Sequence, residues 1–403
     1  MYAALNPFDS QEFSGQLYRT LGKVYLQAAS VGEVLAVAQT ITDLDGESWH
    51  AAWNALGERL AAAAEDCLAA GQRDSARALF LRAAEAYRQA TFFLRDDLDA
   101  PALQHGWRRA VAAFRQAAQL MPHAVEAIRI PFEGRYLHGY AMRPAGAKGQ
   151  LPTIISPSGN DGTAEEQAIA IGFPALARGY GVIAFDGPGQ GNTLFDPETR
   201  AFMRPDYDVV LRAVVDYALS VPGIDADRLV GLGWSFGGYL MPRGASGEQR
   251  LAALIADPGQ YDIGAALSGA LPPALAARIE EDSAEAEAAF EALLQRPSGR
   301  YLFRPRMAAH GKATVQAYVR HLREFTCAGR AAAITCPALI CDNEVDRTST
   351  GQGGMLAEAM TGRVEFCRFT LAEGAGGHCE GMGREVFDQR AFDWLARTFG
   401  HKV

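Results

Sequence analysis

The spacing of hydrophobic residues changes near residue 122. From about residue 48 to residue 121, apolar side chains recur at helical intervals among Ala, Leu, Arg, Glu and Gln, which is typical of amphipathic helices. Polar breaks divide this stretch into three predicted helices, at 48–70, 74–95 and 102–121. Each apolar stripe must be buried against a partner, so we expect residues 1–122 to form a helical region that docks on a core domain.

After residue 122 the chain contains short apolar runs, which are typical of buried strands. Two runs flank the turn Glu133-Gly134 and predict a strand pair. Five further runs predict buried strands, at 152–156, 181–186, 229–233, 251–257 and 338–342. A last run at 364–370 precedes a predicted helix near 386–398. Helix-length stretches separate these runs, so the pattern predicts an α/β fold with a mostly parallel sheet covered by helices on both faces.

Residues 263–335 interrupt this alternation. The segment is rich in Ala and Glu and has helical character, and it is far longer than an ordinary connection between two elements. It falls between the sixth and seventh predicted core strands. We therefore expect a helical lid insertion at 263–335, and a core domain formed by 123–262 and 336–403.

The most informative motif is Gly233-Trp-Ser235-Phe-Gly237, which directly follows one of the apolar runs. The pattern Gly-x-Ser-x-Gly is typical of a nucleophile elbow, in which a serine occupies a sharp turn from a strand to a helix. Glycines are needed there because flanking side chains would collide in so tight a turn. The motif predicts Ser235 as a nucleophile, and a neutral hydroxyl then needs a base that a third group orients.

Chain order indicates the base, because hydrolases built on this elbow place the serine first, then the acid, then the histidine. His378 lies in the Gly-rich stretch 373–380, after the last predicted strand. His401 lies at the end of the chain and is the weaker alternative. The other six histidines precede the strand that is expected to carry the acid. We therefore predict His378 as the base.

Three carboxylates compete for the role of the acid, just after the seventh predicted strand. Asp346 lies in the loop beyond the strand, where its side chain can turn toward His378, so we predict it as the acid. Glu344 is the next candidate. Asp342 is still on the strand, where it would only cap or form an ion pair.

An oxyanion hole requires two backbone N–H groups. The N–H of Phe236, the residue after the predicted nucleophile, is expected to supply one. The second is expected from the loop 158–162, at Asn160 or at Asp161. A plain turn is the alternative for this loop, because residues 163–166, Thr-Ala-Glu-Glu, form a capping-box pattern at the start of a helix. Both interpretations can hold at once.

Other chemistries are disfavoured by their motifs. Residues 186–191, Asp-Gly-Pro-Gly-Gln-Gly, lack the Lys-Ser/Thr ending of a phosphate loop, and residues 231–236 lack the third glycine of a dinucleotide fingerprint. The cysteines and histidines show no zinc-ligand spacing, and Cys379 beside His378 is expected to pack rather than to act as a second nucleophile. We predict no cofactor and no metal.

Composition narrows the class of protein further. The chain has 403 residues, with 49% hydrophobic and 21% charged residues, as expected for a globular protein with more than one domain. Its net charge of −9 disfavours nucleic acid and anionic membranes as partners. Its six scattered cysteines, and the lack of a signal-peptide or membrane-spanning pattern, favour a cytoplasmic protein. We expect a small-molecule substrate and leave a homodimer open.

Five stretches of the chain carry a family resemblance: Asp186-Gly-Pro-Gly-Gln-Gly191, Gly233-Trp-Ser-Phe-Gly-Gly-Tyr239, Asp346-Arg-Thr-Ser-Thr-Gly-Gln352, Glu373-Gly-Ala-Gly-Gly-His-Cys379 and Gln389-Arg-Ala-Phe-Asp-Trp394. Together they resemble one group of α/β-hydrolases. That group includes the 2,6-dihydroxypseudooxynicotine hydrolase of nicotine breakdown and the fungal yellowish-green 1 polyketide-shortening hydrolases. The resemblance implies an α/β-hydrolase fold whose N-terminal helices cover the active site, with Ser235, Asp346 and His378 as a catalytic triad.

The resemblance also implies a reaction, because those members cleave a carbon–carbon bond next to a ketone. In the nicotine-breakdown hydrolase, an acidic residue lies two positions after the oxyanion glycine. Asp161 occupies the matching position in this chain, so the resemblance implies Asp161 as an acid/base or pocket residue. We expect a serine hydrolase that acts on an activated carbonyl, by C–C bond hydrolysis next to a ketone in a small or polyketide-like molecule. An esterase, thioesterase or acyl-transferring cyclase is the alternative within enzymes, and an inactive hydrolase-fold binding protein is the alternative outside them.

Overall fold

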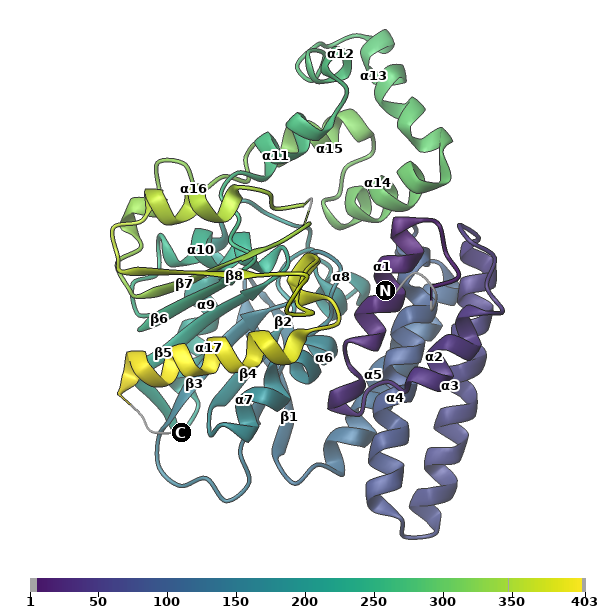
Figure 1. The fold of residues 1–403 in the computed structure, drawn as a ribbon, viewed down its shortest axis with the longest axis vertical. Helices are drawn as coiled ribbons and strands as arrows, with labels where there is room; N and C mark the ends of the chain where they lie inside the picture. The colour runs from purple at the N-terminus through teal and green to yellow at the C-terminus, as the bar shows by residue number, and fades with distance from the viewer. Residues whose placement is uncertain (1–5, 347, 401–403) are drawn as a thin grey trace. The chain divides into compact units, whose positions relative to one another are not determined.

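A computed structural model of the protein describes residues 6–346 and 348–400. The chain divides into two compact units, which Figure 1 draws as one ribbon. The helical unit takes the chain up to Glu126 together with Ala292–Ala308. The sheet unit takes Ala127–Glu291 and the chain from Ala309 onward.

The helical unit is built on three long helices, which confirm the three predicted ones. They are α3, Gly46–Ala69, α4, Arg73–Thr91, and α5, Pro101–Gln119. Helix α4 packs against both α3 and α5, and their apolar stripes enclose Trp49, Trp53 and Tyr87, each at most 2% exposed. Two shorter helices precede them that the sequence pattern does not predict, α1, Gln11–Leu21, and α2, Val31–Ala38.

Helix α14, Pro297–Ala309, belongs almost wholly to the helical unit. The ring of its Tyr301 packs against Phe93 with a centroid distance of 4.8 Å. The Tyr301 hydroxyl accepts a hydrogen bond of 2.8 Å from the backbone N–H of Gly46. The insertion expected at 263–335 is therefore divided between the two units, because an aromatic side chain in its middle packs into the core of the N-terminal helices.

The sheet unit contains eight strands in the order β1-β2-β4-β3-β5-β6-β7-β8. Their bounds are β1, Ala124–Phe132, β2, Arg135–Arg143, β3, Leu151–Pro157, β4, Gly181–Phe185, β5, Ile224–Trp234, β6, Ala253–Asp257, β7, Ala338–Asn343, and β8, Val364–Phe369. Strand β2 pairs antiparallel with β4, and every neighbouring pair from β4 to β8 is parallel. The predicted α/β fold with a mostly parallel sheet is confirmed.

Helices cover both faces of this sheet. Helices α9, Tyr207–Ser220, and α10, Gly237–Ala245, pack together on one face, and α17, Arg384–Phe399, crosses the other (Figure 1). Strands β4 and β6 are buried along their whole length, and each buried Val, Ile or Leu side chain contributes about 1.5–3 kcal/mol. The remaining helices over the sheet are α6, Ala164–Gln167, α7, Phe173–Ala177, α8, Gly191–Phe195, and α16, Gln352–Ala359.

The insertion lies between β6 and β7, as predicted. Its helices within the sheet unit are α11, Ile263–Ala270, α12, Pro273–Ala276, α13, Ala284–Glu291, and α15, Val315–Leu322. Because β3, β5, β6 and β7 run parallel, their carboxyl ends meet at one edge of the sheet, where α/β proteins place their functional residues.

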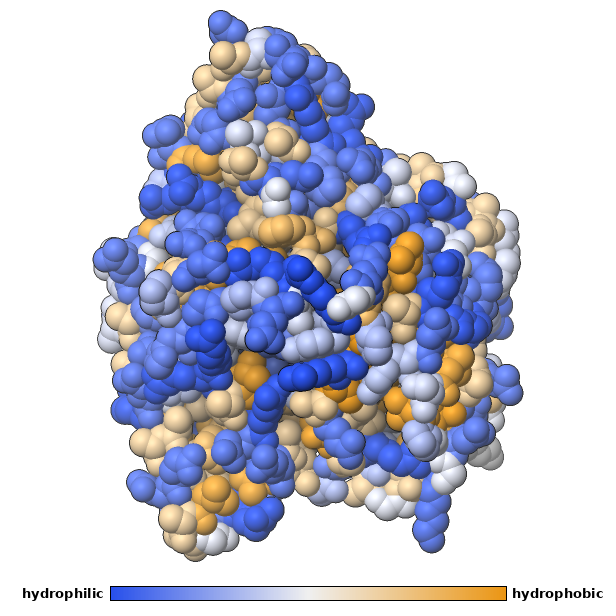
Figure 2. Space-filling view, turned by 180° about the vertical axis from the view of Figure 1, so that it is seen from behind, coloured by the Kyte–Doolittle hydropathy of each residue, from blue (hydrophilic) through white to orange (hydrophobic). Residues whose placement is uncertain are grey.

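The surface seen in Figure 2 is mostly polar, with apolar residues in separate patches rather than in one broad area. Large apolar side chains that are exposed, such as Val345 at 61% and Leu371 at 56%, are few among the described residues. Over residues 6–346 and 348–400, no helix combines the length and the apolar content needed to cross a membrane.

Candidate active site

The turn between β5 and α10 has the geometry that the Gly-x-Ser-x-Gly pattern predicts. Ser235 adopts a positive φ of 60°, and its backbone N–H donates a 2.7 Å hydrogen bond to the carbonyl of Asp257. A Cβ atom at Gly233 would come within 1.9 Å of the Gly237 carbonyl oxygen, and one at Gly238 within 2.0 Å of the Pro258 carbonyl oxygen. Only glycine fits these positions, and the turn presents the serine hydroxyl at the carboxyl edge of the sheet.

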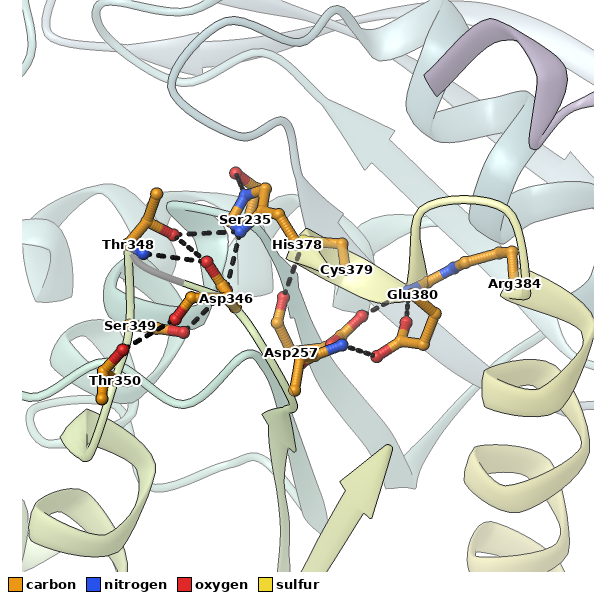
Figure 3. A network of polar contacts seen from close by, with 11 residues as sticks. Ser235, Asp257, Asp346, Thr348, Ser349, Thr350, His378, Cys379, Glu380 and Arg384 are labelled. Carbon is orange, nitrogen blue, oxygen red and sulfur yellow. Dashed lines mark hydrogen bonds and ion pairs between the residues drawn. The ribbon is translucent and has the colours of Figure 1, made fainter. Parts of the chain in front are cut away.

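The structure brings the three predicted residues together (Figure 3). Ser235 Oγ lies 2.8 Å from His378 Nε2, and His378 Nδ1 lies 2.9 Å from Asp346 Oδ2. His378 comes from the loop between β8 and α17, and Asp346 from the loop after β7. With the proton on Nδ1 donated to Asp346, Nε2 is free to accept the proton of the serine hydroxyl, as a general base must.

The competing residues lie elsewhere. The Glu344 carboxylate accepts a 2.8 Å hydrogen bond from the backbone N–H of Leu371, and Asp342 lies 4.0 Å from Arg368. Both carboxylates therefore serve local structure around β7 and β8. His401, the weaker alternative for the base, lies outside the described residues.

Hydroxyl groups hold the carboxylate of Asp346 in place. Thr348 donates to Asp346 Oδ1 from its backbone N–H at 2.9 Å and from its hydroxyl at 2.7 Å. Ser349 donates to Oδ2 at 2.7 Å, and Thr350 to the Asp346 carbonyl at 2.8 Å. The sequence prediction missed these residues, although the run Thr-Ser-Thr just after the acid is a visible signal. These hydrogen bonds fix the direction in which the Asp346 carboxylate faces His378.

The electrostatics of the pair follow from this arrangement. Burial by itself favours a protonated Asp346, but the charge of His378 and the hydrogen bonds from neighbouring hydroxyls hold the Asp346 pKa well below its usual range. Desolvation by itself favours a neutral His378 ring, but the hydrogen bond and charge of Asp346 outweigh it, and the charges of Asp161 and Asp257 add to the rise in the His378 pKa. Asp346 is thus an anion that stabilises a protonated His378.

A buried ionic network lies next to His378 (Figure 3). The Arg384 guanidinium pairs with the carboxylates of Asp257 and Glu380, the latter at 2.5 Å. Asn343 at the end of β7 donates a 2.6 Å hydrogen bond to Glu380. Burial and the charge of Asp257 raise the Glu380 pKa well above its usual range. One cation thus faces two carboxyl groups, and the network ties β6, β7 and α17 to the loop that carries His378.

Cys379 follows the histidine and is buried. Its sulfur lies 3.7 Å from the carbonyl oxygen of Asp257, and burial raises the pKa of its thiol well above the usual value. A neutral, buried thiol is a poor nucleophile, which agrees with the packing role predicted from the sequence.

The loop 158–162 lies beside the nucleophile. A Cβ atom at Gly159 would come within 3.0 Å of Ser235 Cβ and 3.4 Å of its Oγ. Asp161 is close enough for its charge to raise the pKa of His378. The hydroxyl of Thr163 accepts a 3.3 Å hydrogen bond from the backbone N–H of Glu166, so the predicted cap is present as well. Oxyanion binding by the N–H groups of Asn160 and Phe236 stays a prediction.

Part of the insertion packs on the residue after the nucleophile. The ring of Phe236 lies 6.0 Å from that of Phe325 and 6.4 Å from that of His310. All three side chains are at most 8% exposed. This end of the insertion therefore packs against the start of α10.

A second cluster of buried carboxyl groups lies behind the loop 158–162. Asn192 donates 2.8 Å and 3.0 Å hydrogen bonds from Nδ2 to Asp186 and to Glu165, and Tyr140 donates to Glu165 at 2.8 Å. Burial, and then the charge of Glu165, raise the pKa of Asp186 to about 7. Among the described residues, no group of three or more His, Cys, Asp or Glu side chains is arranged to hold a metal ion.

The fold and the arrangement at the carboxyl edge of the sheet define an α/β-hydrolase, and sequence comparison agrees. The model of the alpha/beta hydrolase family matches residues 166–389. Because this match covers more than half of the 403 residues, the chain belongs to the α/β-hydrolase family.

Curated relatives include two fungal hydrolases. Hydrolase LUC6 of Fusarium sp is 32% identical over 274 residues, which cover 66% of this chain and 65% of the relative. The 20-hydroxy-prefusarin hydrolase FUS2 of Gibberella moniliformis is 35% identical over 264 residues, which cover 64% of this chain and 62% of the relative. The matched part of this chain thus spans less than two thirds of the length of either relative.

Solved structures share the fold over almost the whole chain. The 2,6-dihydroxy-pseudo-oxynicotine hydrolase has a TM-score of 0.73 at 23% identity, covering 95% of this chain and 97% of that one. AbyA5 has a TM-score of 0.64 at 17% identity, covering 91% and 89%. The resemblance to this group of α/β-hydrolases, expected from the sequence, is confirmed.

Proposed function

We propose that the protein is a serine hydrolase that cleaves a carbon–carbon bond next to a ketone in a small, polyketide-like molecule. The observation that carries this proposal is the unbroken hydrogen-bonded chain from Ser235 through His378 to Asp346. The names of the two neighbours that specify a compound, 20-hydroxy-prefusarin hydrolase and 2,6-dihydroxy-pseudo-oxynicotine hydrolase, support a small organic substrate.

In the proposed reaction, His378 takes the proton of the Ser235 hydroxyl while Oγ attacks the carbonyl carbon. The N–H groups of Phe236 and Asn160 bind the resulting oxyanion, and Asp346 stabilises the imidazolium. The carbon–carbon bond then breaks, its electron pair leaves as an enolate, and the enolate takes up the proton held on His378, which makes the imidazole neutral again. Water, activated by His378, hydrolyses the acyl-serine and regenerates the hydroxyl.

Proton delivery separates this reaction from ester hydrolysis. An enolate carbon is a poorer leaving group than an alkoxide or a thiolate, so cleavage benefits from an additional proton donor near the scissile bond. Asp161 is close enough to His378 to affect its pKa, so in this proposal it relays the proton of the imidazolium to the leaving carbon. An esterase, a thioesterase or an acyl-transferring cyclase is the second candidate, and it needs only His378 as the donor.

Labelling with a fluorophosphonate probe tests the proposal of a serine hydrolase. We expect stoichiometric labelling of the wild type and none of Ser235→Ala, because the probe reacts only with an activated serine. Ser220→Ala, which removes a hydroxyl bonded to the Tyr217 carbonyl at the end of α9, serves as the control and should label like the wild type. A wild type that is not labelled would favour an inactive binding protein instead.

A further inference from the structure

The loop 186–191, which does not fit a phosphate site, is folded around two of its own side chains. A Cβ atom at Gly187 would come within 2.8 Å of Gln190 Oε1, and one at Gly191 within 2.5 Å of the Asp186 carboxylate oxygens. Gln190 and Asp186 are at most 1% exposed. Gly187 and Gly191 thus leave room for these two side chains.

The Gln190 side chain connects this loop to the loop beside the nucleophile. Its Oε1 accepts a 2.7 Å hydrogen bond from the backbone N–H of Gly187. Its Nε2 donates to the carbonyl oxygen of Ser158 and, at 2.9 Å, to that of Gly159. A side-chain amide has two N–H donors, and Gln190 uses one for each of two consecutive carbonyls.

Because the peptide bond is planar, these contacts also fix the direction of the N–H groups of residues 159 and 160. In a trans peptide the C=O of one residue and the N–H of the next point in opposite directions, and no cis bond lies at residues 158–160. With the Gly159 carbonyl held toward Gln190, the N–H of Asn160 faces the other way. The same argument places the N–H of Gly159 opposite the Ser158 carbonyl, and Gly159 lies against Ser235.

We propose that Gln190 is a positioning residue that holds the peptide groups 158–159 and 159–160 in the orientation in which the N–H of Asn160 binds the oxyanion formed at Ser235. This inference rests on the proposed function, and it identifies the residue that positions the second N–H donor of the oxyanion hole, the first being the N–H of Phe236.

The contacts of Ser158 support the same role. Its hydroxyl donates a 2.6 Å hydrogen bond to Asp186 Oδ1, and its N–H donates at 2.9 Å to the carbonyl of Phe185. The other oxygen of Asp186 accepts the backbone N–H of Asn192 at 2.8 Å. Asp186 thereby fixes both the start of the oxyanion loop and the far end of the loop that carries Gln190. Without the Gln190 amide, the peptide carbonyls at 158 and 159 would lose their partner and the peptides could rotate.

A comparison of oxo- and thionoester substrates tests this role. The sulfur of a thionoester accepts hydrogen bonds poorly, so an intact oxyanion hole favours an aryl ester strongly over its thiono counterpart. In Gln190→Met, we expect kcat/KM for the aryl ester to fall about 100-fold, as on loss of one oxyanion donor. The value for the thionoester should fall much less, so the ratio of the two should drop at least tenfold.

Gln167→Met is the matched control. Gln167 is also buried next to β3, but its amide donates to the hydroxyl of Ser156 at 2.5 Å and not to the oxyanion loop. We expect its ester-to-thionoester ratio to equal that of the wild type. Gln190→Glu keeps the acceptor for the Gly187 N–H, but its carboxylate cannot donate to the carbonyls of Ser158 and Gly159. It should therefore lower the ester-to-thionoester ratio as Gln190→Met does, and it replaces Gln190→Met in the test if Gln190→Met does not fold.

Two outcomes are distinguishable. If both substrates lose the same factor in Gln190→Met and Gln190→Glu, Gln190 is only structural and the inference is overturned, whereas dependence on Ser235 still supports the proposed function. If Ser235→Ala retains ester turnover, the proposed function itself fails, whatever Gln190 does.

Discussion

At Ser235 the backbone adopts a φ of 60°, which is unusual for a residue other than glycine. Such a conformation costs about 1–3 kcal/mol and persists only where the surroundings enforce it. Here the enforcing contacts are the hydrogen bond to Asp257 and the close approach of glycine backbones. The strain places the hydroxyl within 2.8 Å of His378, so local destabilisation and a reactive geometry have the same origin.

Asp161 distinguishes the two candidate reactions. If Asp161 delivers the proton to an enolate leaving group, Asp161→Asn should lower kcat for a 1,3-diketone about 100-fold, within the usual range of general acid catalysis. The same variant should lower kcat for a p-nitrophenyl ester only slightly, because p-nitrophenolate leaves without protonation. Steady-state kinetics on both substrates measures the difference.

Equal losses on the two substrates would leave Asp161 as a residue that shapes the oxyanion loop. If neither substrate is affected, Asp161 belongs to the turn that precedes the Thr163 cap and takes no part in chemistry.

The predicted site residues and the missed ones differ in the kind of signal they leave. Ser235 stands in a local motif, and His378 and Asp346 follow from chain order relative to the strands. Gln190 and Arg384 act on groups that are far away in the sequence. Contacts of that kind are set by the packing of strand ends, which a single sequence does not reveal.

At the scale of elements, the turns that follow β3 and β4 are joined by buried polar groups. Ser158 follows β3, Asp186 follows β4, and Glu165 lies on α6. Their hydrogen bonds compensate for burial, but two carboxyl groups of like charge share the site. Burial, together with the nearby charge of Glu165, raises the pKa of Asp186 to about 7. The stability of these turns is therefore sensitive to pH.

The dependence has a definite sign. An unfolded Asp titrates near pH 4, so between about pH 4 and pH 7 the folded protein binds more protons at Asp186 than the unfolded chain does. The free energy of unfolding should therefore fall as the pH rises through this window. Urea unfolding at pH 5 and at pH 8 measures this fall, and Asp186→Asn should make it smaller.

Asp227→Asn, at an exposed position within β5, is the control and should keep the pH dependence of the wild type. A fall that is identical in Asp186→Asn and in the wild type would show that Asp186 is ionised in the folded protein throughout this range.

The elements themselves were predictable where their pattern is strongly periodic. The strands and α3, α4 and α5 correspond to the predicted runs. A strand buried on both faces needs a continuous apolar run, and a helix buried along one stripe needs apolar residues at helical spacing, so both are visible in the sequence. Helices α1 and α2 are short, and their apolar residues are too few to define a period. The assignment of α14 depends on Tyr301 and its partners in the helical unit, which is tertiary information.

At the scale of the whole molecule, the chain consists of a helical unit and a sheet unit. All residues of the proposed chemistry, from Ser158 to Arg384, belong to the sheet unit. Cover of the active site by the N-terminal helices stays a prediction. The substrate class is therefore proposed from the chemistry of the sheet unit and from the relatives. The matched part of this chain covers 65% of the length of LUC6 and 62% of the length of FUS2.

The central claim is that Ser235 attacks a carbonyl whose neighbouring carbon–carbon bond then breaks. Acid quenching of the wild type during cleavage of a 1,3-diketone, followed by mass spectrometry of the tryptic peptide 229–243, tests it directly. We predict an acyl group on Ser235 with the mass of the fragment that hydrolysis releases as the carboxylic acid, while the ketone fragment leaves as the enolate, and we predict neither adduct nor cleavage in Ser235→Ala. Cleavage of the diketone by Ser235→Ala at the wild-type rate would contradict the account.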